Sequence, residues 1–155
     1  MIRVWIADAD GVHAGTLPDA HRVLEQPGSN AWIDFEGEEE ARVREALAPC
    51  GVHPLVVEDM VMQLNRPKLD DYGDYLYLVV HSARWEPADD RPSLNELDMV
   101  VGERWIVTYH DTPTRSVTAA HELLPRRPAL LAKSPAQLMH FLRSEERRVG
   151  KECRL

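Results

Sequence analysis

Residues 54–62 read PLVVEDMVM, and the helix that they predict is the starting point for interpreting the rest of the chain. Pro54 suits the first position of a helix, because its missing N–H group is not needed there. His53 comes directly before it and is expected to cap the first turn. Pro67 then breaks the helical pattern, so the chain is expected to enter a loop before it.

Apolar segments that follow this helix predict strands. Residues 68–72 and 75–82 flank a Gly-Asp pair that suits a turn. Residues 94–101 and 105–110 are separated by Gly-Glu-Arg and predict a hairpin. Residues 87–92 are polar and contain two prolines, so a loop is expected there.

The two ends of the chain add further strands and helices. Strands are expected over residues 3–7 and 31–35, and helices over residues 21–25, 38–48, 117–124 and from Ser134 onward, with Ser134 as its N-cap. Strands and helices mix without strict alternation, so the predicted fold class is α/β, with a mixed β-sheet covered by helices. The core or its edge is expected to contain Trp32, Ile33, Leu55, Leu76, Leu78, Val80, Val100, Ile106 and Val107.

Composition places the chain among ordinary globular domains. Its 155 residues suit one domain with one core, and its apolar and charged fractions are 44% and 28%. The formal net charge of −8 disfavours nucleic acid as a partner. No apolar run approaches the ~20 residues that cross a bilayer, and no secretory signal opens the chain, so it reads as soluble and cytosolic. Cys50 and Cys153 are not expected to form a disulfide or a zinc site.

Signatures of catalysis are scarce, so the chain is not expected to be an enzyme. It has no Gly-x-Ser-x-Gly elbow, phosphate-binding glycine loop or His-Glu-x-x-His motif. The Asp-Ala-Asp-Gly sequence at residues 8–11 resembles the start of a calcium loop, but a simple turn is the favoured interpretation. His81 and His110 fall near strand ends, where they could approach each other, although two separate positions are favoured.

Glu58 and Asp59 form the more informative pair. They lie toward the C-terminal part of the predicted helix, where negative charge opposes the helix dipole, and a nearby cation would relieve that cost. Adjacent helical residues point in different directions, so the two carboxylates are not expected to chelate one ion together. From the residues alone, a solvated acidic pair is favoured over an ion site. Residues 70–74, which hold three aspartates, are expected to form a polar turn.

Several segments, in order, resemble the N-terminal domain of the CorA magnesium-transporter family. The most telling is residues 51–59, GVHPLVVED, which resembles the family's His-Pro-Leu-x-x-Glu-Asp motif. Further segments that resemble the family are residues 31–34 (AWID), 66–70 (RPKLD), 72–76 (YGDYL), 96–97 (EL), 105–110 (WIVTYH) and 134–139 (SPAQLM). The set covers roughly residues 30 to 142, and its order and spacing make it fairly specific.

The resemblance implies a fold and a function. It implies an αβα sandwich that serves as the cytoplasmic, ion-sensing regulatory domain of a homopentameric Mg²⁺ transporter, held at the membrane by C-terminal helices that this chain lacks. By position in the motif, Asp59 and Glu58 inherit the role of metal-binding sensor residues, for Mg²⁺ or another divalent cation such as Co²⁺, Ni²⁺ or Zn²⁺. Two alternatives remain open: the same domain of a zinc-transporting relative, or a free-standing soluble α/β enzyme.

The resemblance also predicts where the family domain ends. Residues 1–142 are assigned to a CorA-like N-terminal cytoplasmic domain, truncated before the stalk and membrane helices. Residues 143–155 do not resemble the stalk, and they are interpreted as a non-family tail, a junction or read-through segment, with a charged helix end as the alternative. The tail is expected to contribute little to the core.

Overall fold

The computed structural model describes the backbone of residues 1–152, and it describes their side chains except at residues 85, 86 and 149–152. Within this part, one mixed sheet has the strand order β2-β1-β3-β7-β6-β5-β4. The strands are β1 (Ile2–Asp8), β2 (Gly11–Gly15), β3 (Asn30–Glu36), β4 (Lys68–Asp71), β5 (Leu76–Glu86), β6 (Arg91–Val101) and β7 (Trp105–His110). The central pair β3 and β7 is parallel, and the other neighbouring strands are antiparallel.

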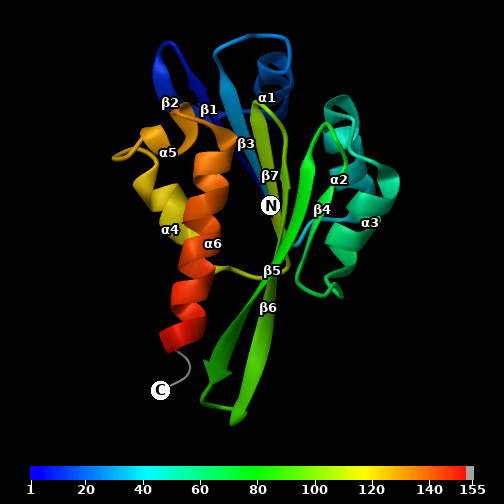
Figure 1. The fold of residues 1–155 in the computed structure, drawn as a ribbon, viewed down its shortest axis with the longest axis vertical. Helices are drawn as coiled ribbons and strands as arrows, with labels where there is room; N and C mark the ends of the chain where they lie inside the picture. Colours follow the sequence, from blue (N-terminus) through cyan, green and yellow to red (C-terminus); the bar gives the residue numbers. More distant parts are fainter. Residues whose placement is uncertain (153–155) are drawn as a thin grey trace.

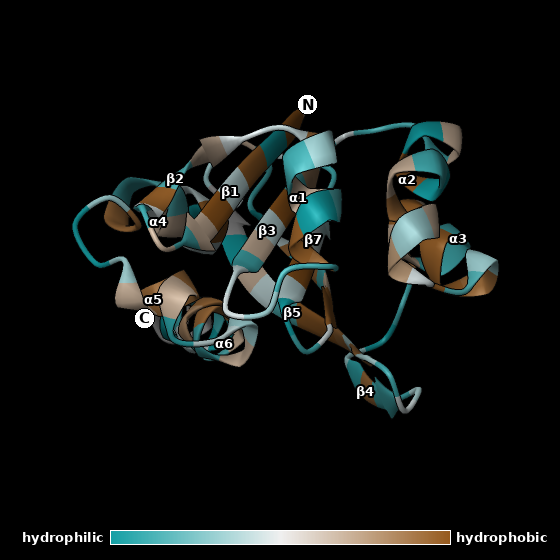
Figure 2. Cartoon of the chain, turned by 90° about the horizontal axis from the view of Figure 1, so that it is seen from above, coloured by the Kyte–Doolittle hydropathy of each residue, from teal (hydrophilic) through white to brown (hydrophobic). Residues whose placement is uncertain are grey.

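Helices cover both faces of this sheet, so the predicted αβα sandwich is confirmed (Figure 1). One face carries α1 (Leu17–Val23), α2 (Glu40–Leu47), a 3₁₀ turn (Ala48–Cys50) and α3 (Pro54–Met62). The opposite face carries α4 (Arg115–Leu123), α5 (Ala129–Ala132) and α6 (Pro135–Glu152). Seen from above, the two helical layers lie on opposite sides of the strands (Figure 2). None of the described helices has the length and apolar character that a membrane crossing requires.

The parallel strands β3 and β7 are deeply buried. Every residue of β7 is buried, and β3 is buried over residues 31–35. A parallel pair with helices on both faces meets no solvent, which is why both strands read as nearly continuous apolar runs. At the other side of the sheet, β5 and β6 extend beyond their other neighbours as a two-stranded hairpin, because β4 pairs with β5 only as far as Val79 and β7 pairs with β6 only from Asp98 (Figure 1).

Helix α3 has the predicted bounds, Pro54–Met62. The Nδ1 atom of His53 accepts a hydrogen bond from the backbone N–H of Leu55 at 3.1 Å, which confirms it as the N-cap. The helix ends at Gln63, whose φ of 53° lies in the left-handed region that usually favours glycine. The Gln63 side chain stabilises this turn by donating to the Met60 carbonyl at 2.9 Å.

Several details differ from the sequence-based predictions. Leu55 was expected in the core but is 62% exposed, because it lies on the side of α3 that faces away from the sheet. Leu76 and Val80 are half-buried, at the edge of the core. The strand β2 was not predicted, because its five residues, GVHAG, carry glycine at both ends and little apolar character. The first helix begins four residues earlier than expected, because Thr16 and Asp19 form a capping box.

The C-terminal segment, which was expected to lie outside the family domain, is helical as far as Glu152. Helix α6 continues beyond Leu142 to Glu152, and the side chain of Glu146 is buried, while residues 153–155 lie outside the described residues. The boundary at residue 142 and the origin of residues 143–155 stay predictions. Cys50 carries a free thiol, and Cys153 belongs to the part that is not described.

Candidate functional site

The last turn of α3 presents the predicted acidic pair at the surface. Glu58 and Asp59 are both half-exposed, and the Asp59 side chain is 47% exposed. The Oδ2 atom of Asp59 lies 3.7 Å from the ammonium nitrogen of Lys68, which is close enough for an ion pair but too long for a hydrogen bond. The carboxylate of Asp59 is therefore loosely held, with one cation beside it.

Lys68 is shared between two carboxylates. Its Nζ atom also lies 3.3 Å from Oδ2 of Asp70 and 4.8 Å from the centre of the Tyr77 ring. Slight burial lowers the pKa of Lys68, but the hydrogen bond with Asp70 and the charges of Asp70 and Asp59 outweigh burial and raise it. Lys68 is accordingly charged across the physiological range, and among the described side chains it is the cation paired with Asp59.

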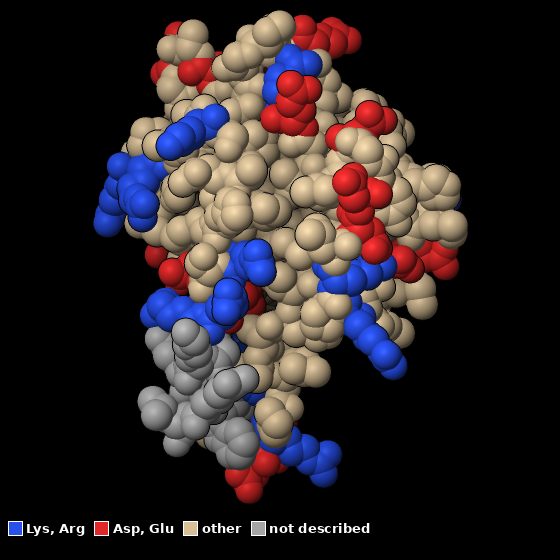
Figure 3. All heavy atoms as spheres, in the orientation of Figure 1, with Lys and Arg blue, Asp and Glu red and all other residues tan. Residues whose placement is uncertain are grey.

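Large apolar side chains are exposed around Asp59. Leu55 and Met62, which are 62% and 54% exposed, lie four residues before and three residues after it, so all three share one face of the helix. The following segment exposes three more, Leu64, Leu69 and Tyr72. Figure 3 shows acidic side chains over the α2 and α3 side of the molecule, with basic side chains directly beside them. This part of the surface has the mixed apolar and charged character of an interface.

A second acidic pair lies between α3 and the sheet. Glu96 and Asp98 occupy alternate positions of β6, so their side chains share one face, and Asp98 is fully buried. The Tyr77 hydroxyl donates to Asp98, and the Gln63 amide donates to its Oδ1 at 3.0 Å. Burial, together with the hydrogen bond and charge of Glu96, raises the pKa of Asp98 to about 9. Asp98 is therefore protonated at neutral pH.

Asn65 connects this buried pair to the surface pair. Its side-chain amide donates to the backbone carbonyl of Asp59 at 2.6 Å and to Oε1 of Glu96 at 2.8 Å. Its backbone N–H donates to Oε2 of Glu96 at 3.2 Å. The end of α3 and the inner strand β6 are thus joined through one side chain.

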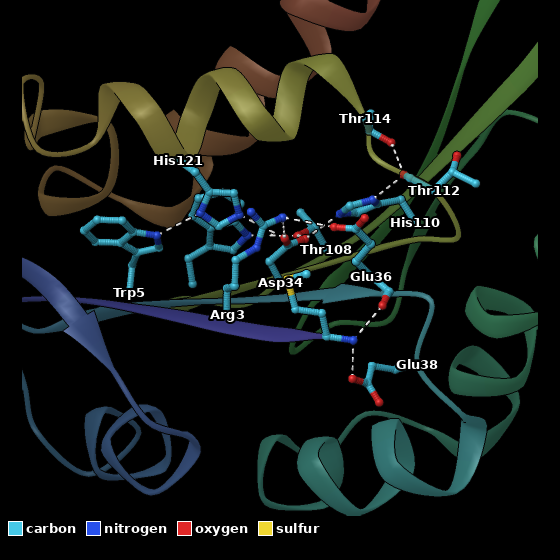
Figure 4. A network of polar contacts seen from close by, with 12 residues as sticks. Arg3, Trp5, Asp34, Glu36, Glu38, Thr108, His110, Thr112, Thr114 and His121 are labelled. Carbon is cyan, nitrogen blue, oxygen red and sulfur yellow. Dashed lines mark hydrogen bonds and ion pairs between the residues drawn. The ribbon is translucent and has the colours of Figure 1, made fainter.

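A different cluster surrounds Asp34 on the opposite face of the sheet (Figure 4). Its Oδ1 atom accepts from the Thr108 hydroxyl at 2.6 Å and from Nε2 of His110 at 2.9 Å. Its Oδ2 atom accepts from Arg3 and from Nε2 of His121, both at 2.9 Å. Burial would raise the pKa of Asp34, but the hydrogen bonds from His110, His121 and Thr108 outweigh it and hold the pKa well below its usual range.

Hydrogen-bond partners define the protonation of both histidines in this cluster. The Trp5 indole donates to Nδ1 of His121 at 2.9 Å, so this nitrogen is an acceptor and His121 is neutral. In His110, Nδ1 contacts the Thr112 carbonyl at 2.7 Å and Nε2 contacts Asp34. Both partners only accept, so both ring nitrogens donate and His110 is an imidazolium. Burial lowers the pKa of His110, but the Asp34 carboxylate outweighs it and raises the pKa.

The two predicted histidines do not meet. His81 lies on β5 and His110 on β7, with β6 between them, as the favoured interpretation held. His81 lies beside Glu96, with 3.7 Å between Nε2 and Oε2, whereas His110 contacts Asp34.

The two predicted turns are also present. At residues 8–11, the Asp8 side chain accepts from the backbone N–H of Asp10 at 2.9 Å. At residues 70–74, the Asp71 side chain accepts from Gly73 at 2.8 Å. Both aspartates therefore stabilise the local chain, which is the turn chemistry that the sequence predicted.

Sequence reasoning missed the residues beneath α3. Glu96 and Asp98 alternate with apolar neighbours in a predicted strand, on the face that packs against a helix. Two carboxylates on an inward-facing side of a strand are unusual, and this pattern was the available signal. Asn65 offered no local signal, because its partners come from α3 and β6. Among the described residues, no three or more His, Cys, Asp or Glu side chains are arranged to hold a metal ion.

Comparisons with known proteins identify the family that the chain resembles. Residues 27–145 match the family described as CorA-like Mg²⁺ transporter protein. The Putative metal ion transporter YfjQ from Bacillus subtilis is 31% identical over 111 residues, which cover 72% of this chain and 34% of that protein. The chain thus spans about a third of the length of this curated relative.

Solved structures show the same fold. The CorA magnesium transporter from Methanocaldococcus jannaschii superposes with a TM-score of 0.69 at 13% identity, over 96% of this chain and 45% of that one. The ZntB cytoplasmic domain from Vibrio parahaemolyticus superposes with a TM-score of 0.66 at 17% identity, over 90% of this chain and 55% of that one. At these identities the likeness concerns the fold alone.

Proposed function

We propose, from the premise that the chain belongs to the CorA-like Mg²⁺ transporter family, that it is the ion-sensing regulatory domain of a divalent-cation transporter. In this proposal the domain lies at the cytoplasmic face of the membrane, and C-terminal membrane helices absent from this chain carry the ion path. Copies of the domain assemble as a homopentamer. Its role is regulatory and non-enzymatic, with Asp59 and Glu58 as the metal-binding residues.

The exposed face of α3 carries this proposal. Leu55 and Met62 are large apolar side chains in water, and covering them with a neighbouring copy would be favourable. Asp59 lies between them on the same face, so the same neighbour would remove water from its carboxylate. A carboxylate that loses water needs a cation or hydrogen-bond donors. An ion at Asp59 would therefore be part of what allows two copies to approach.

The residues present suit a hard divalent cation. Mg²⁺ keeps several of its waters and takes one or two carboxylates, which Asp59 and Glu58 can offer together with carboxylates of a neighbouring copy. Zinc sites in proteins are usually built from Cys and His, so the carboxylate pair favours Mg²⁺ over Zn²⁺. Co²⁺ and Ni²⁺ are further cations to test at the same position. The likeness to the ZntB cytoplasmic domain supports no separate function, because it concerns the fold alone.

Ion binding at this face would act as a sensor by population shift. Without an ion, carboxylates from two copies repel each other and favour separation. With an ion between them, the closed arrangement is stabilised, because the ion binds that arrangement more tightly. High internal Mg²⁺ would then close the transporter, and low internal Mg²⁺ would release it.

Uptake by the complete transporter tests this proposal. Asp59→Ala is expected to raise the internal Mg²⁺ concentration that halves uptake by more than about tenfold. Uptake at low internal Mg²⁺ should stay near the wild-type rate, because the ion path lies elsewhere. Asp10→Ala, which removes an exposed carboxylate from the β1–β2 turn, is the matched control and should leave both values unchanged. Unchanged inhibition in Asp59→Ala would remove Asp59 from the sensor.

The extent of the domain is part of the same proposal. Residues 1–142 form the family domain, and residues 143–155 are a junction or read-through segment. Leu142 is the last buried apolar side chain that the described part of α6 contributes to the core. Removing residues 145–155 is expected to leave the melting temperature of the chain almost unchanged, and a drop of several degrees in a thermal scan would show that this segment packs as part of the domain.

A further inference from the structure

We propose that Asn65 is a positioning residue for the ion sensor: it ties the main-chain carbonyl of Asp59 to the carboxylate of Glu96 and so sets where Asp59 lies on the outer face of α3. This inference rests on the proposed function, because it concerns how well Asp59 can meet an ion. It assigns a role to Asn65 and Glu96, which lie behind the sensor face and would not touch the ion.

Asn65 donates hydrogen bonds both to α3 and to β6. A primary amide carries two hydrogens, and the two nearest acceptors are the Asp59 carbonyl at 2.6 Å and Oε1 of Glu96 at 2.8 Å. The backbone N–H of Asn65 adds a bond to Oε2 of Glu96 at 3.2 Å, so the Glu96 carboxylate is held through both oxygens. Hydrogen bonds to an ionised group are stronger than those between neutral groups. The Glu96 side chain is only 8% exposed, which protects these bonds from water.

The end of α3 depends on such a tie. The last four carbonyls of a helix have no partner within it, and Asp59 belongs to this last turn. Gln63 and Asn65 each donate to a carbonyl of this turn, those of Met60 and Asp59. Each amide also reaches a carboxylate of β6, since Gln63 donates to Asp98 at 3.0 Å. Two side-chain amides thus clamp the end of α3 to β6.

The side chain of Asp59 has no comparable restraint of its own. Lys68, at 3.7 Å, is beyond hydrogen-bond distance and is itself shared with Asp70. The position of the Asp59 carboxylate is therefore set mainly by its backbone, which Asn65 holds. Sites that bind ions need their ligands placed within about 0.5 Å, so loosening this carbonyl should weaken ion binding without removing a ligand.

The test compares two asparagines whose side-chain amides each donate to a main-chain carbonyl, in different parts of the fold. Asn65→Ala removes the tie to Asp59. Asn30→Ala is the control, because the Asn30 amide likewise donates to the main chain, to the carbonyls of Leu131 at 2.9 Å and Ala132 at 3.3 Å, away from α3. Both variants are measured in the complete transporter for inhibition of uptake by internal Mg²⁺. The melting temperature of each variant is measured in the isolated 155-residue chain.

Both variants are expected to lower the melting temperature, but only Asn65→Ala should change sensing. The Mg²⁺ concentration that halves uptake is expected to rise about tenfold in Asn65→Ala, as for loss of a residue that orients an ion ligand, and to stay at the wild-type value in Asn30→Ala. Glu96→Gln keeps the size of the side chain and removes its charge. It should shift the same concentration in the same direction by less.

The outcomes separate this inference from the function on which it rests. If Asp59→Ala raises the half-inhibitory concentration while Asn65→Ala and Glu96→Gln leave it at the value of Asn30→Ala, the role of Asn65 is overturned and the sensor stands. If Asp59→Ala changes nothing, both proposals fall. If Asn65→Ala does not fold, Glu96→Gln decides, and an unchanged concentration in that variant overturns the inference.

Discussion

Two buried carboxylates on opposite faces of the sheet have pKa values that are shifted in opposite directions. Asp34, on β3, is 1% exposed and has a pKa held well below its usual range, whereas Asp98, on β6, is 0% exposed and has a pKa of about 9. Burial acts on both in the same direction. The difference comes from the neighbours, because Asp34 accepts from an arginine, a threonine and two histidines, and Asp98 shares its site with Glu96.

This contrast separates a structural region from the region to which we assign the proposed function. The donors around Asp34 come from β1, β7 and α4, so one ionised carboxylate joins three elements, and the side chain is fully satisfied (Figure 4). On the α3 side, a protonated acid, a loosely paired Asp59 and exposed apolar residues lie together. In the proposed function, this face, which exposes apolar groups beside a loosely paired carboxylate, would receive a cation and a partner surface.

The largest effect is expected from Asp34→Asn. This change removes the buried counter-charge of the His110 imidazolium and leaves Arg3 with Glu36 as its carboxylate partner, and it places an amide N–H₂ group among donors. We expect a loss of about 3–5 kcal/mol in the free energy of unfolding, measured by urea denaturation at pH 7. Asp10→Asn, in an exposed turn, is the control and should change stability by less than about 0.5 kcal/mol. A loss below about 1 kcal/mol in Asp34→Asn would contradict the ionised state of Asp34.

The same substitution at Asp98 is expected to act in the opposite direction at neutral pH. Asparagine resembles a protonated aspartate in shape and charge, so Asp98→Asn should be close to the wild type in stability near pH 4 and more stable than the wild type at pH 7, because only the wild type has to take up a proton on folding. The folded pKa of Asp98, about 9, lies above the unfolded value of 3.8, so the folded chain keeps a proton that the unfolded chain releases. Stability from this group is complete below about pH 4 and is lost as the pH rises toward 9.

The pH dependence of unfolding therefore distinguishes the two states of Asp98. His110, whose raised pKa also makes the folded chain hold a proton, contributes a loss of stability at rising pH in the wild type and in the variant alike. The difference between the two proteins isolates Asp98. Asp98→Asn should lose less stability than the wild type between pH 6 and pH 9. Parallel curves would show that Asp98 is already ionised at neutral pH.

A smaller effect is expected from Lys68→Met. The ammonium of Lys68 lies beside Asp59, so an incoming divalent ion has to compete with it. Exposed ion pairs contribute less than about 1 kcal/mol, so removing this competitor should lower the Mg²⁺ concentration that halves uptake by about two- to fivefold. Lys133→Met, an exposed lysine before α6, is the control. A higher half-inhibitory concentration in Lys68→Met would mean that Lys68 supports the site.

Local patterns in the sequence were enough for much of the fold. The bounds of α3 and β7 were predicted because Pro54, His53 and the apolar runs act through neighbours in the chain. The prediction that Leu55 lies in the core was wrong, because a helix pattern identifies an apolar residue without showing whether its face is covered. The strand β2 escaped detection because pairing with β1, and not its own composition, makes it a strand.

The hydrogen-bond networks around Asp34 and Asn65 were harder to predict, because their members lie far apart in the sequence. Asp34 meets partners 31 to 87 residues away, and no local spacing reveals such contacts. Asn65 likewise takes its role from Glu96, which lies 31 residues further along the chain. The Glu58-Asp59 pair was found because its motif is continuous, whereas the residues that hold it in place are brought together only by the sheet.

The central claim is that the outer face of α3 is where a divalent cation acts, and a Mg²⁺ titration followed by backbone amide chemical shifts tests it most directly. In the isolated 155-residue chain, we expect shifts confined to α3 and residues 63–70, with a dissociation constant on the order of millimolar, because one copy supplies only part of the ligand set. These shifts should be lost in Asp59→Ala and unchanged in Asp10→Ala. Shifts centred on Asp34, or shifts at α3 that persist in Asp59→Ala, would contradict the account.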